Sequence, residues 1–185
     1  MGAHDTAPAI PAHELAPLFV TARLHARRWH AGDLDALVAV YGDAQAMRYV
    51  GDGQPLTRAG CEEWLAVTRA NYEKRGYGML ALAEAASGAV VGFAGIVHPG
   101  GQAEPEVKYA FRRSHWGMGL ATEAVSALLR HARDELGLSG IIATTHPENT
   151  ASHRVLVKAG MAPAELLVDE DWRMTQFFRY PQAST

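Results

Sequence analysis

The segment RRSHWGMGLAT, residues 112–122, joins an alternating run of residues to a strongly periodic helical pattern. Two glycines just before a helix let the backbone pass close to a ligand, and the N–H groups and positive dipole end of the first helical turn attract an anion. Arg112 and Arg113 add two positive charges, and Thr122 adds a hydroxyl. The segment therefore predicts a phosphate-binding turn, although glycines that merely permit a strand-to-helix turn give the same local pattern.

Two better-known phosphate motifs do not fit these residues. The chain contains no Gly-Lys-Ser/Thr sequence, and GMGLAT at residues 117–122 lacks the third glycine of the dinucleotide fingerprint. The acidic residue that would bind a ribose about 20 positions later is also missing from the end of the next expected strand. A P-loop and a dinucleotide-binding turn are therefore both excluded.

The rest of the chain predicts a single mixed α/β domain. Apolar residues recur at helical spacing over 119–136 with charged residues opposite, which predicts an amphipathic helix. Residues 1–18, rich in Ala, Pro and His, are expected to form a loose leader before one domain at 19–185. We expect strands at 19–29, 78–85, 89–97, 106–112 and 141–145, strand-like runs around Leu166 and Phe177, and helices at 34–41, 57–75 and 149–159.

Composition and charge exclude several classes of function. The 185 residues carry 17 Lys and Arg against 20 Asp and Glu, a net charge of −3 that disfavours nucleic acid as a partner. The one cysteine, Cys61, cannot form an internal disulfide, and the nine histidines show no metal-ligand spacing. No apolar run approaches the roughly 18 residues of a membrane span. We therefore expect a cytoplasmic protein without a metal and without nucleic-acid or membrane partners.

Two segments together resemble the acyl-CoA motifs of the GNAT acetyltransferases. Residues 116–124, WGMGLATEA, are similar to the family's acyl-CoA loop, with Trp116 in place of the usual Gln or Arg, and residues 147–161, PENTASHRVLVKAGM, are similar to its second cofactor-side motif. Residues 21–24, TARL, and 106–109, EVKY, resemble the branch that contains ribosomal-protein N-terminal acetyltransferases. The resemblance implies an α/β (α+β) fold with a central mixed, mostly antiparallel sheet that is splayed in the middle and has helices on both faces.

The resemblance also implies an acetyl-CoA site. Backbone N–H groups of residues 117–121 are expected to bind the pyrophosphate of coenzyme A, and the pantetheine arm is expected to follow the strand that ends near Phe111. The cofactor-side residues implied are Phe111, Arg112, Arg113, Trp116, Gly117, Met118, Gly119, Leu120, Ala121, Thr122 and Asn149. A homodimer is the family's expectation for assembly.

Acyl transfer to an amine requires a neutral amine and therefore a base. At pH 7, deprotonation costs about 4.6 kcal/mol for a lysine amine but only about 1.1 kcal/mol for an α-amino group, so a terminal amine is the easier substrate. The resemblance places the base at Glu106, whereas the residues alone favour a surface ion pair between Glu106 and Lys108, two positions apart on one strand face. His146 is a second candidate base with a better-suited ordinary pKa.

The departing thiolate needs a hydrogen-bond donor. Leu156 occupies the place where many GNAT enzymes carry a tyrosine, and the resemblance points instead to Ser152, although Asn149 and Ser152 could equally form a helix cap. A backbone N–H near Ala110 or Phe111 is implied for the oxyanion. The chain is thus expected to acetylate a protein N-terminus or a small-molecule amine, the alternative being a non-catalytic coenzyme A module. Candidate aromatic residues for the acceptor pocket are Tyr49, Trp64, Tyr72, Tyr77 and Trp172.

Overall fold

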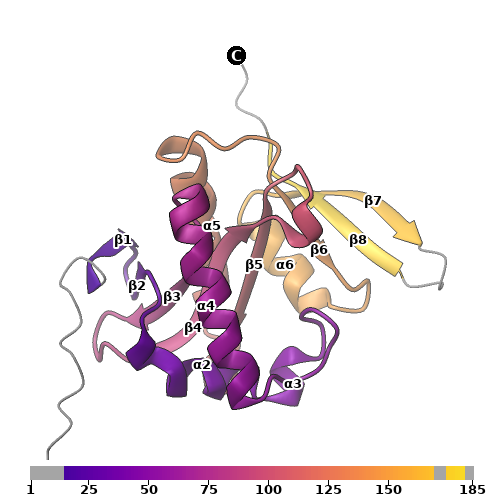
Figure 1. Ribbon diagram of the computed structural model, residues 1–185. Helices are drawn as coiled ribbons and strands as arrows, with labels where there is room; N and C mark the ends of the chain where they lie inside the picture. Colours follow the sequence, from indigo (N-terminus) through magenta and orange to yellow (C-terminus); the bar gives the residue numbers. More distant parts are fainter. Residues whose placement is uncertain (1–14, 169–173, 182–185) are drawn as a thin grey trace, which may run out of the picture.

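The computed structural model describes residues 15–168 and 174–181 (Figure 1). Their strands form one eight-stranded sheet. The strand order is β1-β2-β3-β4-β5-β6-β8-β7, and all neighbouring strands are antiparallel except β5 and β6. The strands are β1 (Pro17–Val20), β2 (Leu24–Arg27), β3 (Met79–Glu84), β4 (Val90–Val97), β5 (Glu106–Phe111), β6 (Ile142–Thr145), β7 (Ala162–Val168) and β8 (Met174–Arg179).

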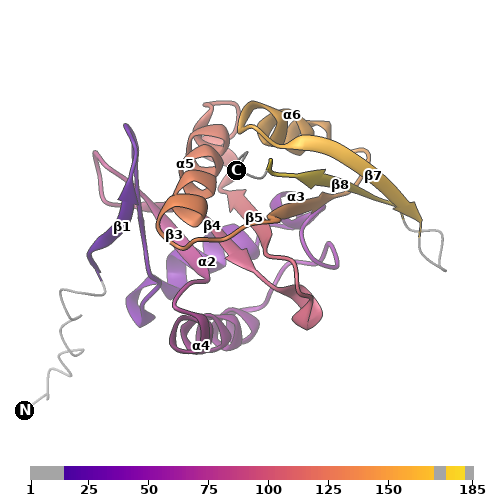
Figure 2. The same cartoon turned by 90° about the horizontal axis from the view of Figure 1, so that it is seen from above.

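Helices cover both faces of this sheet (Figure 2). One face carries α2 (Leu34–Tyr41), α3 (Ala44–Met47) and α4 (Arg58–Arg75), and the other carries α5 (Leu120–Asp134) and α6 (Thr150–Lys158). Short 3₁₀ turns lie at Ala31–Asp33, Pro99–Gly101 and Arg113–His115. Each face has its own hydrophobic core, so the expected sheet with helices on both sides is confirmed.

The sheet is splayed between β5 and β6, which positions the site described below. β5 pairs with β4 along its whole length, from Glu106 opposite Val97 to Phe111 opposite Gly92. β5 and β6 share only the pair Glu106 and Ile142. Beyond that pair the two strands diverge, and β6 pairs with β8 on its other side. The expected splayed sheet is therefore confirmed.

Local signals explain why the predicted helices and hairpin form where expected. The Thr57 hydroxyl accepts the Gly60 N–H at 3.1 Å and caps α4, which ends at Gly76 with a left-handed φ of +79°. The β3–β4 hairpin turns through Gly88, whose φ is +72°. The α5 helix buries its apolar face as its periodicity predicts.

The single strand expected at 19–29 is wrong, because residues 17–27 form a hairpin of β1 and β2 instead. Thr21 makes the turn: its N–H donates to the Leu24 carbonyl at 2.8 Å, and its hydroxyl accepts the Leu24 N–H at 3.0 Å. β1 begins at Pro17, inside the segment expected to be a leader, while residues 1–14 of that segment lie outside the described part of the chain. The short α3 was not expected either; it begins where Asp43 accepts two main-chain N–H groups.

Candidate active site

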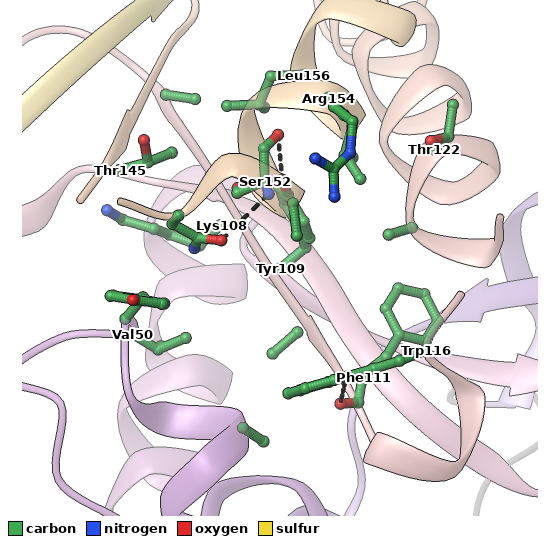
Figure 3. A pocket seen from close by; sticks show the side chains of 18 of the residues that line it. Val50, Lys108, Tyr109, Phe111, Trp116, Thr122, Thr145, Ser152, Arg154 and Leu156 are labelled. Atoms are coloured by element: carbon green, nitrogen blue, oxygen red, sulfur yellow. Dashed lines mark hydrogen bonds between the residues drawn. The ribbon is translucent and has the colours of Figure 1, made fainter. Parts of the chain in front are cut away.

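A cavity of about 600 Å³ opens where β5 and β6 diverge (Figure 3). Its walls come from β5 after Glu106, from β6, from the turn and first residues of α5, from α6, and from α3 with the loop that follows it. These segments are distant from one another in the sequence. The cavity therefore exists only once the sheet and both helical layers have assembled.

The predicted glycine turn forms one end of this cavity. Gly117 and Gly119 have φ angles of +75° and +78°, in the left-handed region that favours glycine. Gly119 is the residue before α5, so the N–H groups of Leu120, Ala121 and Thr122 start the helix without an intrahelical acceptor. Gly117, Gly119, Leu120, Ala121 and Thr122 all line the cavity. The turn thus offers main-chain donors at the positive end of the helix dipole.

Most of the expected cofactor-side residues line the cavity. The Trp116 indole N–H donates to the Phe111 carbonyl at 2.8 Å, which holds the ring at the cavity wall (Figure 3). The side-chain oxygen of Asn149 accepts the Ser152 N–H at 3.2 Å and caps α6, as the local pattern allows. The expected residues found in the lining are Phe111, Trp116, Gly117, Gly119, Leu120, Ala121, Thr122 and Asn149.

The structure does not bring Arg112, Arg113 and Met118 to the cavity lining. Arg113 is held by Asp43, whose carboxylate accepts from Nε at 2.5 Å, and this hydrogen bond lowers the pKa of Asp43. The Met118 side chain is half exposed, while its carbonyl accepts a hydrogen bond from the Arg23 guanidinium at 2.8 Å. Arg112 and Arg113 therefore lie outside the cavity lining, and the guanidinium of Arg113 is engaged by Asp43.

Positive charge reaches the cavity from residues to which sequence analysis gave no role. Arg154 and Lys158 lie one turn apart on α6 and both line the cavity, as do Lys108 on β5 and Arg48 after α3. Figure 3 shows Arg154 and Lys108. Within the described part of the chain, no Asp or Glu belongs to the lining. A chain of net charge −3 thus forms a cationic cavity, which suits an anionic ligand. The sequence does contain a signal for this charge, because Arg154 and Lys158 are four positions apart in the second motif and so share one face of a helix.

Beyond Glu106, the edge of β5 toward β6 is unpaired, and the N–H and C=O groups of every second residue point from this edge into the cavity. The Phe111 carbonyl accepts from Trp116, and the Pro105 carbonyl accepts from Ile142 of β6, so the odd-numbered residues of this strand direct their backbone groups toward β6. The N–H groups of Tyr109 and Phe111 therefore point into the splay. That of Ala110 points toward the paired strand β4, which leaves Phe111 as the better of the two expected oxyanion donors.

Two hydroxyls meet at the centre of the cavity wall. The Tyr109 hydroxyl lies 2.5 Å from the Ser152 Oγ, and both residues line the cavity (Figure 3). Burial raises the pKa of Tyr109 to about 12, although the hydrogen bond with Ser152 opposes part of this rise. Tyr109 thus stays a neutral hydrogen-bond donor at physiological pH. Sequence analysis assigned Ser152 but missed Tyr109, because nothing local signals a contact across 43 residues.

Glu106 lies behind the cavity wall. Its side chain is buried, with 2% of its surface exposed, and it accepts hydrogen bonds from Lys108, from the Thr144 hydroxyl and, at 3.2 Å, from Gln102. The ion pair with Lys108 exists, but it is not at the surface as the alternative reading held. Lys108 and Thr144 line the cavity, whereas Glu106 does not. Any proton that reaches Glu106 must therefore pass through one of its hydrogen-bond partners.

The other candidate base and the candidate aromatic residues are mostly elsewhere. His146 is exposed, outside the cavity lining, and its ring stacks on Tyr49 at 5.2 Å. Tyr49 lines the cavity, but Trp64 and Tyr72 pack in the core, and Tyr77 borders a separate cavity of about 200 Å³. Trp172 lies outside the described residues.

Cys61 is buried in the core beneath α2 and α4, away from the cavity. Residues 15–168 and 174–181 contain no group of three or more metal-binding side chains placed to hold an ion. The same ranges contain no helix that is both long and apolar enough to cross a membrane.

A splayed α/β sheet with an amide-lined glycine turn at one end of a cationic cavity is the arrangement of an acyl-CoA-dependent acyltransferase. Residues 23–162 match the family model described as the acetyltransferase (GNAT) domain, and the chain belongs to this family. The protein is therefore an acetyl-CoA-dependent acetyltransferase, as its two sequence motifs predict.

Relatives of known sequence and structure agree with this assignment. The chain is 27% identical over 141 residues to the uncharacterized N-acetyltransferase YnaD of Bacillus subtilis, covering 76% of this chain and 80% of YnaD. A solved acetyltransferase from Agrobacterium tumefaciens superposes with a TM-score of 0.76 at 26% identity, covering 89% and 94% of the two chains. RimL, a ribosomal L7/L12 α-N-protein acetyltransferase solved with coenzyme A, shares the fold with a TM-score of 0.75 at 13% identity, covering 88% and 96%. The expected membership of the GNAT family is thus confirmed, and a ribosomal-protein acetyltransferase is among the structures that share its fold.

Proposed function

We propose that this protein transfers an acetyl group from acetyl-CoA directly to a primary amine while both substrates are bound. The observation that carries the proposal is the continuity of the cavity from the glycine turn of α5 to the splay between β5 and β6. This cavity suits an acyl carrier whose phosphates would lie at the glycine turn and whose thioester would lie in the splay between β5 and β6. The fold shared with RimL, which was solved with coenzyme A, supports the same carrier.

The lining residues fit coenzyme A in their chemistry. The N–H groups at the start of α5 suit its pyrophosphate, and Arg154 and Lys158 supply the positive charge that Arg112 and Arg113 do not. The outward N–H groups of β5 suit the pantetheine amides, and that of Phe111 suits an oxyanion. Asn149 is fixed as a helix cap beside this path.

Glu106 is proposed as the base, acting through the Thr144 hydroxyl. Thr144 lines the cavity and donates its proton to Glu106, so it can take a proton from the amine as its own passes to the carboxylate. The neutral nitrogen then forms the new C–N bond, and the second proton that it loses as the amide forms passes to solvent. Lys108, which also contacts Thr144 at 3.0 Å, keeps the carboxylate and hydroxyl in place.

The Ser152 hydroxyl is proposed to stabilise the leaving group, with Tyr109 behind it. As the C–S bond breaks, the sulfur keeps the electron pair and leaves as a thiolate that accepts a hydrogen bond from Ser152. Tyr109 donates in turn to the Ser152 oxygen, 2.5 Å away. The donor is thus a pair of hydroxyls from β5 and α6, which replaces the tyrosine absent at Leu156.

The acceptor is proposed to be an α-amine of a protein N-terminus or of a small molecule. Such an amine is neutral far more often at pH 7 than a lysine side chain. The amine must lie near Thr144 for this mechanism, on the side of the cavity where Lys108 donates to the Thr144 hydroxyl at 3.0 Å. Val50 lies near Lys108 in the lining (Figure 3), and Tyr49, the residue before Val50, also lines the cavity.

The proposal is tested first by binding and turnover with wild-type protein. Calorimetry with coenzyme A should show uptake, and a thiol-release assay with a panel of N-terminal peptides, amino acids, polyamines and aminoglycosides should show turnover with at least one amine. Initial rates against both substrates should give intersecting lines, as direct transfer requires. Coenzyme A binding without turnover on any amine would favour a non-catalytic module, and no binding would refute the proposal.

Variants of the proton path give a sharper test. Glu106→Gln and Thr144→Val should each lower kcat about 100-fold or more, because general base catalysis contributes about 10² to 10⁴ in rate. Acetyl-CoA affinity should not change, and Thr144→Ser, which restores the hydroxyl, should recover most of the activity. Full activity in Thr144→Val would show that Glu106 does not act through this residue.

A further inference from the structure

Arg23, at the β1–β2 turn, is bound to both the glycine turn and the first turn of α5. Its Nη1 donates to the Met118 carbonyl at 2.8 Å, and its Nε donates to the Glu123 carboxylate at 2.7 Å. The main-chain N–H of Arg23 also donates to Glu123 at 2.9 Å, and the Thr21 hydroxyl does so at 2.6 Å. Residues about 100 positions apart are thereby joined beside the cavity, although none of Thr21, Arg23 and Glu123 lines it.

We propose that Arg23 is a positioning residue that orients the main-chain donors of the glycine turn toward the diphosphate of acetyl-CoA. The proposal rests on the function proposed above. No peptide bond within residues 15–168 and 174–181 is cis, so the Met118–Gly119 peptide is trans and its C=O and N–H point in opposite directions. A Met118 carbonyl held by Arg23 therefore directs the Gly119 N–H away from Arg23, and Gly119 itself lines the cavity whereas Arg23 does not.

The turn needs such an external contact because glycine restrains it poorly. Gly117 and Gly119 flank Met118, and residues without a Cβ rotate more freely than any other. The exposed side chain of Met118 provides little packing against the protein. The Arg23 hydrogen bond thus restricts a peptide that would otherwise sample several orientations, most of which turn its N–H away from the ligand.

Arg23 also offsets an unfavourable charge beside the phosphate site. Glu123 lies in the first turn of α5, where its carboxylate would repel a bound diphosphate. Burial alone would raise the pKa of Glu123, but hydrogen bonds from Thr21 and Arg23 outweigh it, so the pKa is lowered and the carboxylate stays ionised. The Arg23 guanidinium lies 2.6 Å from this carboxylate and balances its charge. An ordinary surface ion pair would have neither of these effects on the ligand.

The test compares two acetyl donors that differ in the diphosphate. In Arg23→Ala, the KM for acetyl-CoA should rise about tenfold, as expected for one lost aligned donor to a charged acceptor, while kcat stays unchanged. With S-acetylpantetheine, which has no diphosphate, kcat/KM should equal that of the wild type. Arg58→Ala is the matched control, because Arg58 is an exposed arginine paired with Asp35 at 2.8 Å on the face of α2 and α4. Arg58→Ala should leave kcat and KM unchanged with both acetyl donors.

The outcomes separate this inference from the function on which it rests. If wild-type protein neither binds coenzyme A nor uses acetyl-CoA, the proposed function fails. If the wild type is active but Arg23→Ala loses kcat/KM equally with both donors, or with neither, the role of Arg23 is refuted. Should Arg23→Ala not fold, Arg23→Lys serves instead, because it keeps the charge but loses the planar fork, and a loss of about threefold limited to acetyl-CoA is expected.

Discussion

Replacing Tyr109 with phenylalanine removes one oxygen from the proposed donor pair and leaves the ring in place. The magnitude follows from acidities. A phenol with a pKa of about 12 is a weaker acid than an ordinary thiol near 8.5, so complete proton transfer to the thiolate would be uphill by roughly 5 kcal/mol. The pair must therefore act by hydrogen bonding, in which Ser152 contacts the charged thiolate and Tyr109 contacts the neutral Ser152 hydroxyl. A hydrogen bond between neutral groups contributes about 0.5 to 1.5 kcal/mol. We expect kcat of Tyr109→Phe to fall by about 2- to 12-fold.

The assay is thiol release at saturating acetyl-CoA, with Ser152→Ala and the double variant measured alongside. Because Tyr109 acts through Ser152, whose Oγ is 2.5 Å away, the double variant should be little slower than Ser152→Ala alone. The wild-type rate should not decline between pH 8 and 10 through ionisation of Tyr109, because burial raises its pKa to about 12. Undiminished kcat in Tyr109→Phe, or losses that multiply in the double variant, would refute the hydroxyl pair.

Three further predictions concern stability. Gly119→Ala should lower the free energy of unfolding by roughly 1 to 2 kcal/mol in urea titrations, because its φ of +78° strains a residue with a Cβ, and it should also weaken coenzyme A binding. Thr57→Ala, which removes the cap on Gly60 at 3.1 Å, should cost about 1 kcal/mol in the same titrations without changing kcat. Burial raises the pKa of Tyr72 and of Tyr109 to about 12 from 10.0, so their contribution to stability is complete below pH 10 and should be lost as the pH rises from 10 toward 12, as urea midpoints will show.

The fold was largely predictable because its elements depend on local patterns. The amphipathic period of α5, the cap and stop of α4 and the Ser87–Gly88 turn are each visible within one element. The exception at residues 19–29 has a local cause that strand propensity does not register, since the Thr21 hydroxyl bonds the Leu24 backbone and turns the chain.

The parts of the site that could be predicted are the glycine turn and side chains within the two motifs, such as Ser152 and Asn149. The glycine turn lines the cavity as expected, because its conformation depends on its own residues. The surroundings of the charged residues could not be predicted, because they depend on partners distant in the sequence. Asp43 binds Arg113 across 70 residues, and Lys108 and Thr144 bind Glu106 where it is buried. Sequence analysis likewise missed Tyr109 and Arg23, whose roles depend on contacts with α6 and α5.

The alternation of side chains along β5 explains why direct transfer suits this fold. Successive residues of a strand point to opposite faces of the sheet, so Glu106 and Lys108 share one face and Tyr109 shares the other with Val107 and Phe111. The two hydrophobic cores confirm this division, since Ala110 belongs to the core under α2 and α4, whereas Val107 and Phe111 belong to the core under α5 and α6. The proposed base and the proposed thiolate donor therefore approach the free edge of β5 from opposite sides. An acyl carbon held at that edge would have its incoming amine on one side and its departing sulfur on the other, so the transfer needs no protein nucleophile between them.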